Sequence, residues 1–419
     1  MTVLLLIAAV AAAPDVFFVS VDTLRADRLG CYGCPLATSP AIDQLAAQGL
    51  LFEDCVCEVP LTAPSFGSML SSQYPRNTGL TRNGLRMPDR IPLVAEAFRA
   101  AGYQTVCIQS NWTLKADLSG LDRGFDVYED DFHRKRWGFI KSERRADEVT
   151  SVALKALKHR DPDKPLFMWV HYSDPHAPYK FHPSYSPRGR SRRGMDHHGR
   201  VRAAYDSEIA YTDHYIKNLL KRLPKNNRYI LFVADHGESL YEHDYLGHGR
   251  RIYQTGIHIP LFIVGPGIEP GRSDVPARGV DIGPTLLGLA DIEPMPGALG
   301  VNLLDHRPNP DRARVIETYG GAVPGIPGAK ALMADDPPQY QGVLLDGWKL
   351  ITNDDGAALY HINHDPMELK DLATEQPDRV EMLGQLIDEW DATQVRESGD
   401  EATLSGDDLR ALESLGYLE

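Results

Sequence analysis

Short apolar runs alternate with helical patterns over most of this chain, and this alternation constrains the fold more than any other feature. From Asp15 to about Val264, β-branched and apolar stretches are followed by segments whose apolar residues recur at helical spacing. Such alternation is typical of a parallel sheet covered by helices. The stretches are apolar nearly throughout, as expected of strands buried on both faces. We predict strands at Val16–Val21, Thr105–Gln109, Leu166–His171, Tyr229–Ala234 and Leu261–Val264.

The chain changes character after about Leu304. Before this point, apolar residues at a period of about 3.6 mark two helices: Val149, Ala153, Ala156 and Leu157 in the first, and Ile209, Ile216, Leu219, Leu220 and Leu223 in the second. After it, Gly and Pro crowd residues 320–338, and strands at Val343–Ile351 and Ala357–His361 precede a helix near Arg379–Trp390. We therefore expect a large α/β domain over residues 14–304 and a small α+β subdomain over residues 305–419.

An apolar run opens the chain, from Val3 to Ala13. It is about half the length that a membrane-spanning helix needs, so no integral membrane segment is expected. The run ends in small residues before Pro14 and resembles a short secretory signal peptide over residues 1–13, although no Lys or Arg precedes it. The sequence thus predicts an exported protein, periplasmic or secreted. A mis-set start codon or a buried first strand is the alternative.

The charge balance excludes one class of partner. Acidic residues outnumber basic ones by 58 to 44, which gives a formal net charge of −14. Because nucleic-acid binding proteins are net basic, we expect no nucleic acid partner. One segment departs from this acidity and is expected to form a loop between a strand and a helix, either as a solvated surface or as a basic rim that attracts an anionic substrate. It contains Arg188, Arg190, Arg192, Arg193, Arg200 and Arg202 with His197 and His198, and Asp196 as its only acidic residue.

The five cysteines leave at least one thiol unpaired, because their number is odd. Cys55 and Cys57 lie two apart on an expected strand and face the same side, which suits bonds to other partners better than to each other. Cys31 and Cys34 form C-Y-G-C, but they follow a loop rather than the turn that a redox pair requires. We expect a structural role, for which one bridge from Cys34 to Cys55 or Cys57 is a candidate.

Three possible metal ligands follow predicted strands. Asp22 comes after the first strand, and Asp235 and His236 come after a later one. Open α/β sheets build their sites at this edge, although a lone Asp at a strand end is more often a helix cap. Thr62 opens the segment T-A-P-S-F-G, in which Pro64 suits a first helical turn. A hydroxyl there lies in the positive field of the helix, which favours its alkoxide form, but Thr62 alone could equally be an N-cap.

These residues lie in ordered motifs that continue toward the C-terminus. The motifs are S-V-D-T-L-R-A-D at 20–27, C-Y-G at 31–33, S-P-A-I-D-Q-L-A-A-Q-G at 39–49, T-A-P-S at 62–65, H-Y-S-D-P-H-A-P-Y at 171–179 and D-H-G-E-S-L-Y-E-H at 235–243, with V-D-I-G-P-T-L-L at 280–287 and L-Y-H-I-N-H-D-P-M-E-L at 359–369. Together they resemble the sulfatases of the alkaline phosphatase superfamily. The resemblance implies an alkaline phosphatase-like α/β sandwich, with a mostly parallel central sheet flanked by helices and a small C-terminal α+β subdomain.

The resemblance also implies a role for individual residues. Asp22, Asp235 and His236 match the metal ligands of the family, and Thr62 matches its nucleophile, which is itself a ligand. His176 and His248 match catalytic positions that bind the sulfuryl or phosphoryl oxygens and assist the leaving group. Asn111 is a further, weaker candidate for a substrate contact. His243 is interpreted as structural.

Several departures from the family bear on the chemistry. Its sulfatases carry Cys or Ser, followed by x-P-S-R, and convert that residue to formylglycine; here Thr62 and Phe66 stand at the nucleophile and Arg positions. Thr cannot become the aldehyde hydrate, so Thr62 would have to attack directly. Sulfatases of the family hold Ca²⁺, whereas His236, together with Thr23 at the usual second Asp, favours Mn²⁺ or Zn²⁺ as the single divalent ion. Asp174 and His176 lack the i, i+4 spacing of the second metal site of alkaline phosphatase.

Three functions follow from this pattern. The leading prediction is a metal-dependent hydrolase that cleaves a sulfate or phosphate ester by in-line displacement at Thr62, with phosphate monoesters, diesters or phosphonates favoured because metal and cationic contacts ease phosphoryl transfer. The expected substrate is a small anionic ester, a sulfated or phosphorylated glycan or a lipid head group. The alternatives are a transferase of phospho-alcohol groups from the same superfamily and a non-catalytic anion-binding protein.

Overall fold

The computed structural model describes residues 12–131, 143–305, 312–319, 340–353 and 356–401. Nearly all of the predicted signal segment 1–13 lies outside the described residues. The Gly- and Pro-rich segment 320–338 does so as well. The statements below concern the described part of the chain.

A central sheet of eight strands organises the larger part of the molecule, in the order β12-β2-β11-β8-β1-β7-β5-β6. From β8 to β6 every neighbouring pair is parallel, and β11 runs antiparallel to both β8 and β2. The prediction of a mostly parallel sheet is therefore confirmed. Its strands are β1 (Asp15–Val21), β2 (Leu50–Phe52), β5 (Gln104–Ile108), β6 (Val127–Glu129), β7 (Leu166–Tyr172), β8 (Arg228–Ala234), β11 (Leu261–Val264) and β12 (Gly271–Ser273).

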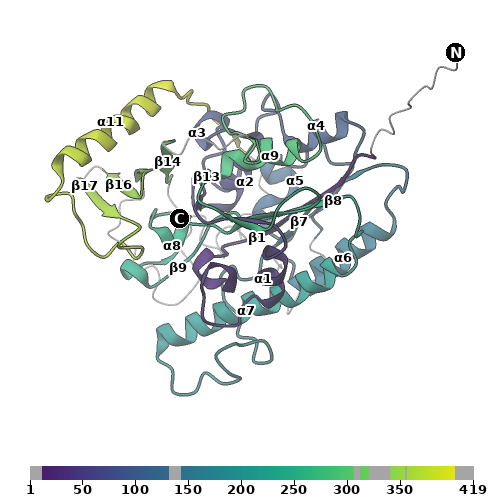
Figure 1. Ribbon diagram of the computed structural model, residues 1–419, viewed down its shortest axis with the longest axis horizontal. Coiled ribbons are helices and arrows are strands. Elements are labelled where there is room, and N and C mark those ends of the chain that lie inside the picture. The colour runs from purple at the N-terminus through teal and green to yellow at the C-terminus, as the bar shows by residue number, and fades with distance from the viewer. Residues whose placement is uncertain (1–11, 132–142, 306–311, 320–339, 354–355, 402–419) are drawn as a thin grey trace, which may run out of the picture.

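Helices cover both faces of this sheet (Figure 1). One face carries α1 (Pro40–Ala46), α6 (Ala146–Lys158) and α7 (His197–Leu220), and the other carries α2 (Thr62–Ser71), α4 (Val94–Ala100), α5 (Ala116–Ser119) and α9 (Ile282–Gly288). Because β1 and β7 are buried at every position, their side chains pack against helices on both sides. This three-layer arrangement is the predicted sandwich. No helix among the described residues is both long enough and apolar enough to span a bilayer.

The Arg-rich segment was expected to form a loop, but its last residues belong to helix α7. Asp196 is the N-cap of α7, and its side chain accepts a hydrogen bond from the backbone of Gly199 at 2.7 Å. The helix therefore begins at His197, so that Arg200 and Arg202 lie on its first turns. Arg188 is paired with the buried Asp206 of the same helix.

A second, antiparallel sheet follows in the order β14-β15-β16-β17, and α11 packs on it with a small apolar cluster of its own. The elements are β14 (Arg314–Glu317), β15 (Gln341–Leu345), β16 (Trp348–Asn353), β17 (Gly356–His361) and α11 (Pro377–Thr393). The single strand predicted at Val343–Ile351 is wrong. Asp346 and Gly347 have φ of 49° and 74°, which turns the chain back between β15 and β16 as a two-residue hairpin.

Short elements complete the described fold. Three two-stranded ladders pair β3 (Cys55–Val56) with β13 (Ala277–Arg278), β9 (Ser239–Leu240) with β10 (Leu246–Gly247), and β4 (Leu85–Arg86) with β18 (Asp400–Glu401). Two single-turn helices are α3 (Pro75–Thr78) and α8 (Gln254–Ile257). Through the pairing of β18 with β4, the end of the described chain lies against the large domain.

All five cysteines are free thiols, so the expected bridge from Cys34 to Cys55 or Cys57 is wrong. Cys55 and Cys57 belong to the main apolar core, whereas Cys34 is partly exposed in a loop. Burial raises the pKa of each of the Cys55 and Cys57 thiols well above the usual range for cysteine. These side chains act as small apolar groups of the core.

Candidate active site

The parallel pairing of β1 and β8 brings three predicted metal ligands together. Val21 at the end of β1 lies opposite Ala234 at the end of β8, so the next residues, Asp22 and Asp235, leave the sheet side by side with His236. All three side chains are fully buried, and one ligand atom from each lies within 4.8 Å of the other two. The site forms at the carboxyl ends of the strands, as expected for an open α/β sheet.

Hydrogen bonds orient this cluster. Asp235 Oδ1 accepts from the backbone N–H groups of Thr23 at 3.1 Å and His236 at 2.8 Å. His236 Nδ1 lies 2.9 Å from the carbonyl oxygen of Gly237, which can only accept, so Nδ1 carries the proton. The Nε2 lone pair of His236 is therefore left for another partner.

The donor set fits a divalent cation. Asp22 Oδ1 and Asp235 Oδ2 are buried and have no hydrogen-bond partner among the described residues. Burial raises the pKa of Asp235 well above its usual range, and the adjacent Asp22 carboxylate raises it further. Burial alone would raise the pKa of Asp22 too, but the charges of His176 and His171 hold it well below its usual range. Two carboxylates, an imidazole nitrogen and a nearby hydroxyl are ligands that Zn²⁺ or Mn²⁺ accepts.

Thr62 is the first residue of α2, and its hydroxyl faces the cluster. Thr62 Oγ1 lies 3.3 Å from His236 Nε2, and the side chain is fully buried. Leu61, not Thr62, is the N-cap. The start of α2 is held in place because Ser65 Oγ donates to the Asp235 carbonyl at 2.7 Å, and Asn83 Oδ1 accepts from the Ala63 N–H at 3.0 Å. The Thr62 hydroxyl thus lies at the positive end of the α2 dipole.

His176 and His248 lie beside His236. The ring centroids of His236 and His248 are 4.5 Å apart, and those of His176 and His248 are 5.3 Å apart. Although burial would lower the pKa of His176, the charges of Glu143 and Asp22 raise it to about 10. His176 is therefore a cation at neutral pH. Burial, together with the charge of the nearby His248, lowers the pKa of His236 to about 3, so that His236 is in the neutral form that binds a metal.

Asn111 also reaches this site, through Asp22. Its amide nitrogen donates to Asp22 Oδ2, and its oxygen caps the single-turn helix at Trp112–Leu114 by accepting from the Thr113 N–H at 2.9 Å. Asn111 thus orients a candidate ligand, and its contact with substrate stays a prediction. His243 lies apart, where it stacks on Tyr253 with ring centroids 3.7 Å apart.

Three further residues of the site were not predicted. Glu143 pairs with His176 at 2.6 Å, and Glu238 lies 3.1 Å from Nδ1 of His248. His171 is fully buried, with Nε2 3.7 Å from Asp22 Oδ2 and Nδ1 3.0 Å from Ser20 Oγ. Glu238 and His171 stand inside the motifs described above, and that position was a usable signal. Glu143 lies in no such motif.

Phe66 and Thr23 mark where this chain departs from the sulfatase pattern. Phe66, one turn after Thr62 on α2, packs between Trp169 and His171, with ring centroids 4.9 Å from each. At the position where the family pattern has Arg, this chain therefore has a Phe that belongs to an aromatic cluster. Thr23 has a φ of 52°, a strained conformation for a β-branched residue, and its buried hydroxyl has no partner among the described residues. Thr23 directly follows the candidate ligand Asp22, and Phe66 contacts His171, whose Nε2 lies 3.7 Å from Asp22 Oδ2.

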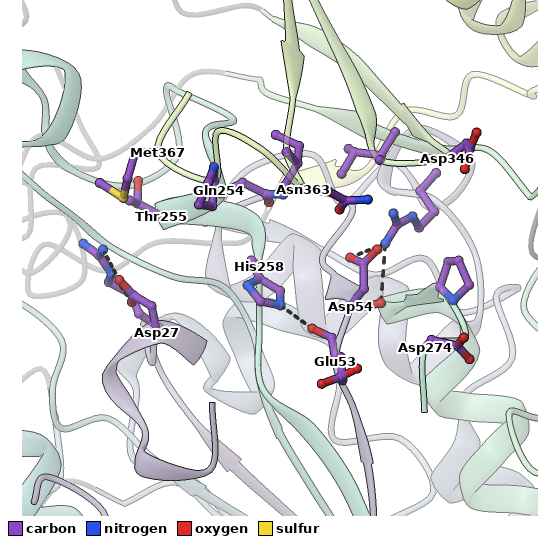
Figure 2. Close-up of a pocket in the computed structure, with 17 residues that line it drawn as sticks. Asp27, Glu53, Asp54, Gln254, Thr255, His258, Asp274, Asp346, Asn363 and Met367 are labelled. Carbon is purple, nitrogen blue, oxygen red and sulfur yellow. Dashed lines mark hydrogen bonds and ion pairs between the residues drawn. The ribbon is translucent and has the colours of Figure 1, made fainter. Parts of the chain in front are cut away.

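A cavity of about 700 Å³ lies between the two sheets, apart from these residues. Figure 2 shows Asp27, Glu53 and His258 on the side of the large domain and Asn363 and Met367 on the side of the small sheet. None of the predicted site residues lines it. The wall is rich in carboxylates, two of which are paired with Arg25 and Arg314. Such a wall does not attract the anionic esters expected at Thr62.

Comparison with known proteins decides the family. The model of the sulfatase family matches residues 14–292. This chain belongs to the sulfatase family. It is 26% identical over 368 residues to an ulvan-active sulfatase of Formosa agariphila, an alignment that covers 75% of this chain and 70% of the relative. The predicted membership of the alkaline phosphatase superfamily is confirmed.

Solved structures support the fold of this sulfatase family member. A protein solved in complex with its substrate D-glucosamine-2-N,6-O-disulfate superposes with a TM-score of 0.74 at 21% identity, over 91% of this chain and 98% of that one. The phosphonate monoester hydrolase of Agrobacterium radiobacter gives a TM-score of 0.70 at 20% identity, over 91% and 96%. The sandwich with its small antiparallel sheet is therefore shared with both.

Proposed function

We propose that this protein is a metal-dependent hydrolase that cleaves a sulfate or phosphate ester, with Thr62 as the nucleophile. The observation that carries the proposal is the position of Thr62 Oγ1, 3.3 Å from His236 Nε2 at the start of α2. That position combines the field of a helix N-terminus with two buried carboxylates and a neutral imidazole. A serine or threonine hydroxyl needs such activation before it can act as a nucleophile.

Asp22, Asp235, His236 and Thr62 would hold one divalent cation. When bound, the cation would supply positive charge that favours the alkoxide of Thr62 and neutralises an anionic ester. Asn111 would keep Asp22 oriented through its amide hydrogen bond. We favour Mn²⁺ or Zn²⁺ over Ca²⁺ because His236 brings a nitrogen ligand.

The cationic and proton-transfer roles fall to the two remaining histidines. His176, held positive by Glu143, would bind the non-bridging oxygens of the ester. Thr62 Oγ would bond to phosphorus or sulfur while the bond to the alcohol oxygen breaks in line, and His248 would give that oxygen its proton. Water, giving a proton to His248, would then attack phosphorus or sulfur in line from the side that the alcohol left. The bond to Thr62 Oγ would break, which releases the anion and restores the hydroxyl.

The choice of ester follows from the nucleophile. Thr62 has no route through an aldehyde hydrate, so both steps are direct displacements, which cationic contacts favour most for phosphoryl groups. Phosphate monoesters, diesters and phosphonates are therefore our first substrates. Sulfated glycans are the second, because a structural neighbour was solved with a disulfated glucosamine. The resemblance of segment 1–13 to a signal peptide supports the proposal that this activity lies outside the cytoplasm.

One assay tests this function. The metal-free protein is loaded separately with Ca²⁺, Mn²⁺ or Zn²⁺, and nitrophenol release is measured from a sulfate ester, a phosphate monoester, a phosphodiester and a phosphonate. Thr62→Val keeps the shape of the side chain without its hydroxyl, and should lose activity on the best substrate by on the order of 10³-fold or more. Nitrophenol release that depends on an added acceptor alcohol would favour the transferase. Tight anion binding without turnover would favour a binding protein.

A further inference from the structure

A second cluster of possible metal ligands consists of Asp174, His182 and Glu208, none of which has a role in the proposed reaction. One ligand atom from each lies within 4.8 Å of the other two. Asp174 follows β7 in the turn toward His176, His182 lies farther along the same loop, and Glu208 projects from α7. The sequence analysis considered Asp174 only together with His176, as a pair without the spacing of the second metal site of alkaline phosphatase. The fold places His182 and Glu208, which lie in no motif, beside Asp174.

Contacts with α7 and α6 hold the three side chains. The His182 backbone N–H donates to Ser207 Oγ at 2.9 Å, and its ring stacks on Tyr211 with centroids 4.3 Å apart and 12° between planes. Asp174 Oδ2 accepts from the N–H of Ala146, the first residue of α6, at 2.7 Å. The cluster is thus fixed by secondary structure on two sides.

Two ligand atoms in the cluster are buried and have no partner in the described part of the chain. Glu208 is 4% exposed and His182 is 8% exposed. Glu208 Oε2 and His182 Nε2 have no hydrogen-bond partner among the described residues. The 3.9 Å between His182 Nε2 and Glu208 Oε1 is too long for a hydrogen bond. A buried polar atom without a partner is costly, and a buried carboxylate more so.

The two carboxyl groups of the cluster, Asp174 and Glu208, lie close to each other. Burial raises the pKa of Glu208 well above its usual range, and the Asp174 carboxylate adds to this. Burial raises the pKa of Asp174 to about 7. The charge of Arg145 counteracts part of this rise at Asp174. Arg145 lies over the Tyr211 ring and donates to its hydroxyl, and it makes no ion pair with Asp174 or Glu208 within the described residues. Burial also lowers the pKa of His182 to about 4, with Arg145 adding to the effect, which keeps the imidazole in its metal-binding form.

We propose that Asp174, His182 and Glu208 bind a second divalent ion of the Zn²⁺ or Mn²⁺ class. Two carboxylate oxygens and one imidazole nitrogen suit such an ion, whereas Ca²⁺ takes six to eight oxygen ligands. Asp174 is the most exposed of the three residues, so water can complete the coordination. The ion would fix the turn that carries His176, two residues after Asp174, and would act on the reaction through the position of that side chain.

The test uses a background in which the first site is removed. Asp235→Asn eliminates a ligand of the candidate catalytic metal, so metal retained by this variant reports on the second cluster alone. The full chain is freed of metal with a chelator and titrated calorimetrically with Zn²⁺, Mn²⁺ or Ca²⁺. The expected result is one equivalent of Zn²⁺ or Mn²⁺ bound, a raised Tm, and no binding of Ca²⁺.

Glu208→Gln in the Asp235→Asn background should abolish that binding and its effect on Tm. The substitution keeps the shape of the side chain and removes a buried charge, so the fold should survive, which circular dichroism checks. Glu58→Gln is the matched control: it changes another buried carboxylate with a raised pKa, and should keep the bound equivalent. An unchanged stoichiometry in Glu208→Gln, no Zn²⁺ or Mn²⁺ binding in Asp235→Asn, or equal binding of Ca²⁺ would each overturn the proposal. None of these results depends on turnover at Thr62.

Discussion

Glu143 Oε1 lies 2.6 Å from Nδ1 of His176, and this pair joins a residue outside every motif to a predicted catalytic one. The contact gives His176 its charge, because Glu143 and Asp22 raise its pKa to about 10 against the effect of burial. A His176 that is cationic at neutral pH suits a site for anionic esters.

Glu143→Gln should therefore shift the pH dependence of turnover. Without the carboxylate, the pKa of His176 falls, so the cationic form is lost at lower pH. We expect the alkaline limb of the kcat/KM profile to move down by about one pH unit or more, with little change at acidic pH, where His176 stays protonated. Steady-state profiles of wild type and variant measure this. An alkaline limb that stays in place would contradict the role of the pair.

Asn111→Leu should weaken metal binding. The Asn111 amide orients Asp22, and removal of a group that holds a metal ligand typically costs 10- to 100-fold in affinity. Competition with a chelator gives the dissociation constants. Asn363→Leu, an exposed change near the small sheet, serves as the control. An affinity equal to wild type, together with a raised KM, would assign Asn111 to the substrate instead.

Phe66→Ala should destabilise the fold because Phe66 is fully buried against Trp169 and His171. Loss of a buried aromatic ring costs about 3–5 kcal/mol. Urea unfolding monitored by circular dichroism measures this. Phe66→Leu, which keeps most of the apolar volume, should cost less than half as much. Equal losses for the two variants would show that the ring is not what packs there.

Glu58 should make stability pH-dependent. Burial raises its pKa from the ordinary 4.5 to about 7, so the folded state binds the proton more tightly than the unfolded state. The resulting stabilisation is complete below about pH 4.5 and is lost as the pH rises through 7. The pKa difference corresponds to about 3 kcal/mol. Between pH 5 and 8, the free energy of unfolding of wild type should fall by roughly this amount more than that of Glu58→Gln. The same pH dependence in both proteins would contradict the role of Glu58.

The sequence predicted five of the eight strands of the large sheet, because these five are apolar nearly throughout; the short strands β2, β6 and β12 were missed. Predicted Leu261–Val264 coincides with β11, and the other predicted strands of the sheet end within one residue of β1, β5, β7 and β8. The hairpin at Asp346 and Gly347 was missed because the apolar pattern continues across the turn. The D-G pair there was the signal available.

The candidate site was predictable only where local sequence decides it. Asp22 and Asp235 could be placed because each follows a buried strand. Glu143 and Glu208 could not, because their positions depend on how the segment before α6 and one face of α7 pack near His176. Such contacts join distant segments, and no spacing along the chain encodes them.

The most direct test of the account is the chemical state of Thr62 during turnover. The metal-loaded protein is mixed with its best nitrophenyl ester, quenched in acid within one turnover and digested, and the peptide that contains Thr62 is analysed by mass spectrometry. We predict a gain equal to one phosphoryl or sulfuryl group on Thr62, in step with a burst of nitrophenol, and neither in Thr62→Val. Full turnover by Thr62→Val, or a burst without modified Thr62, would contradict Thr62 as the nucleophile.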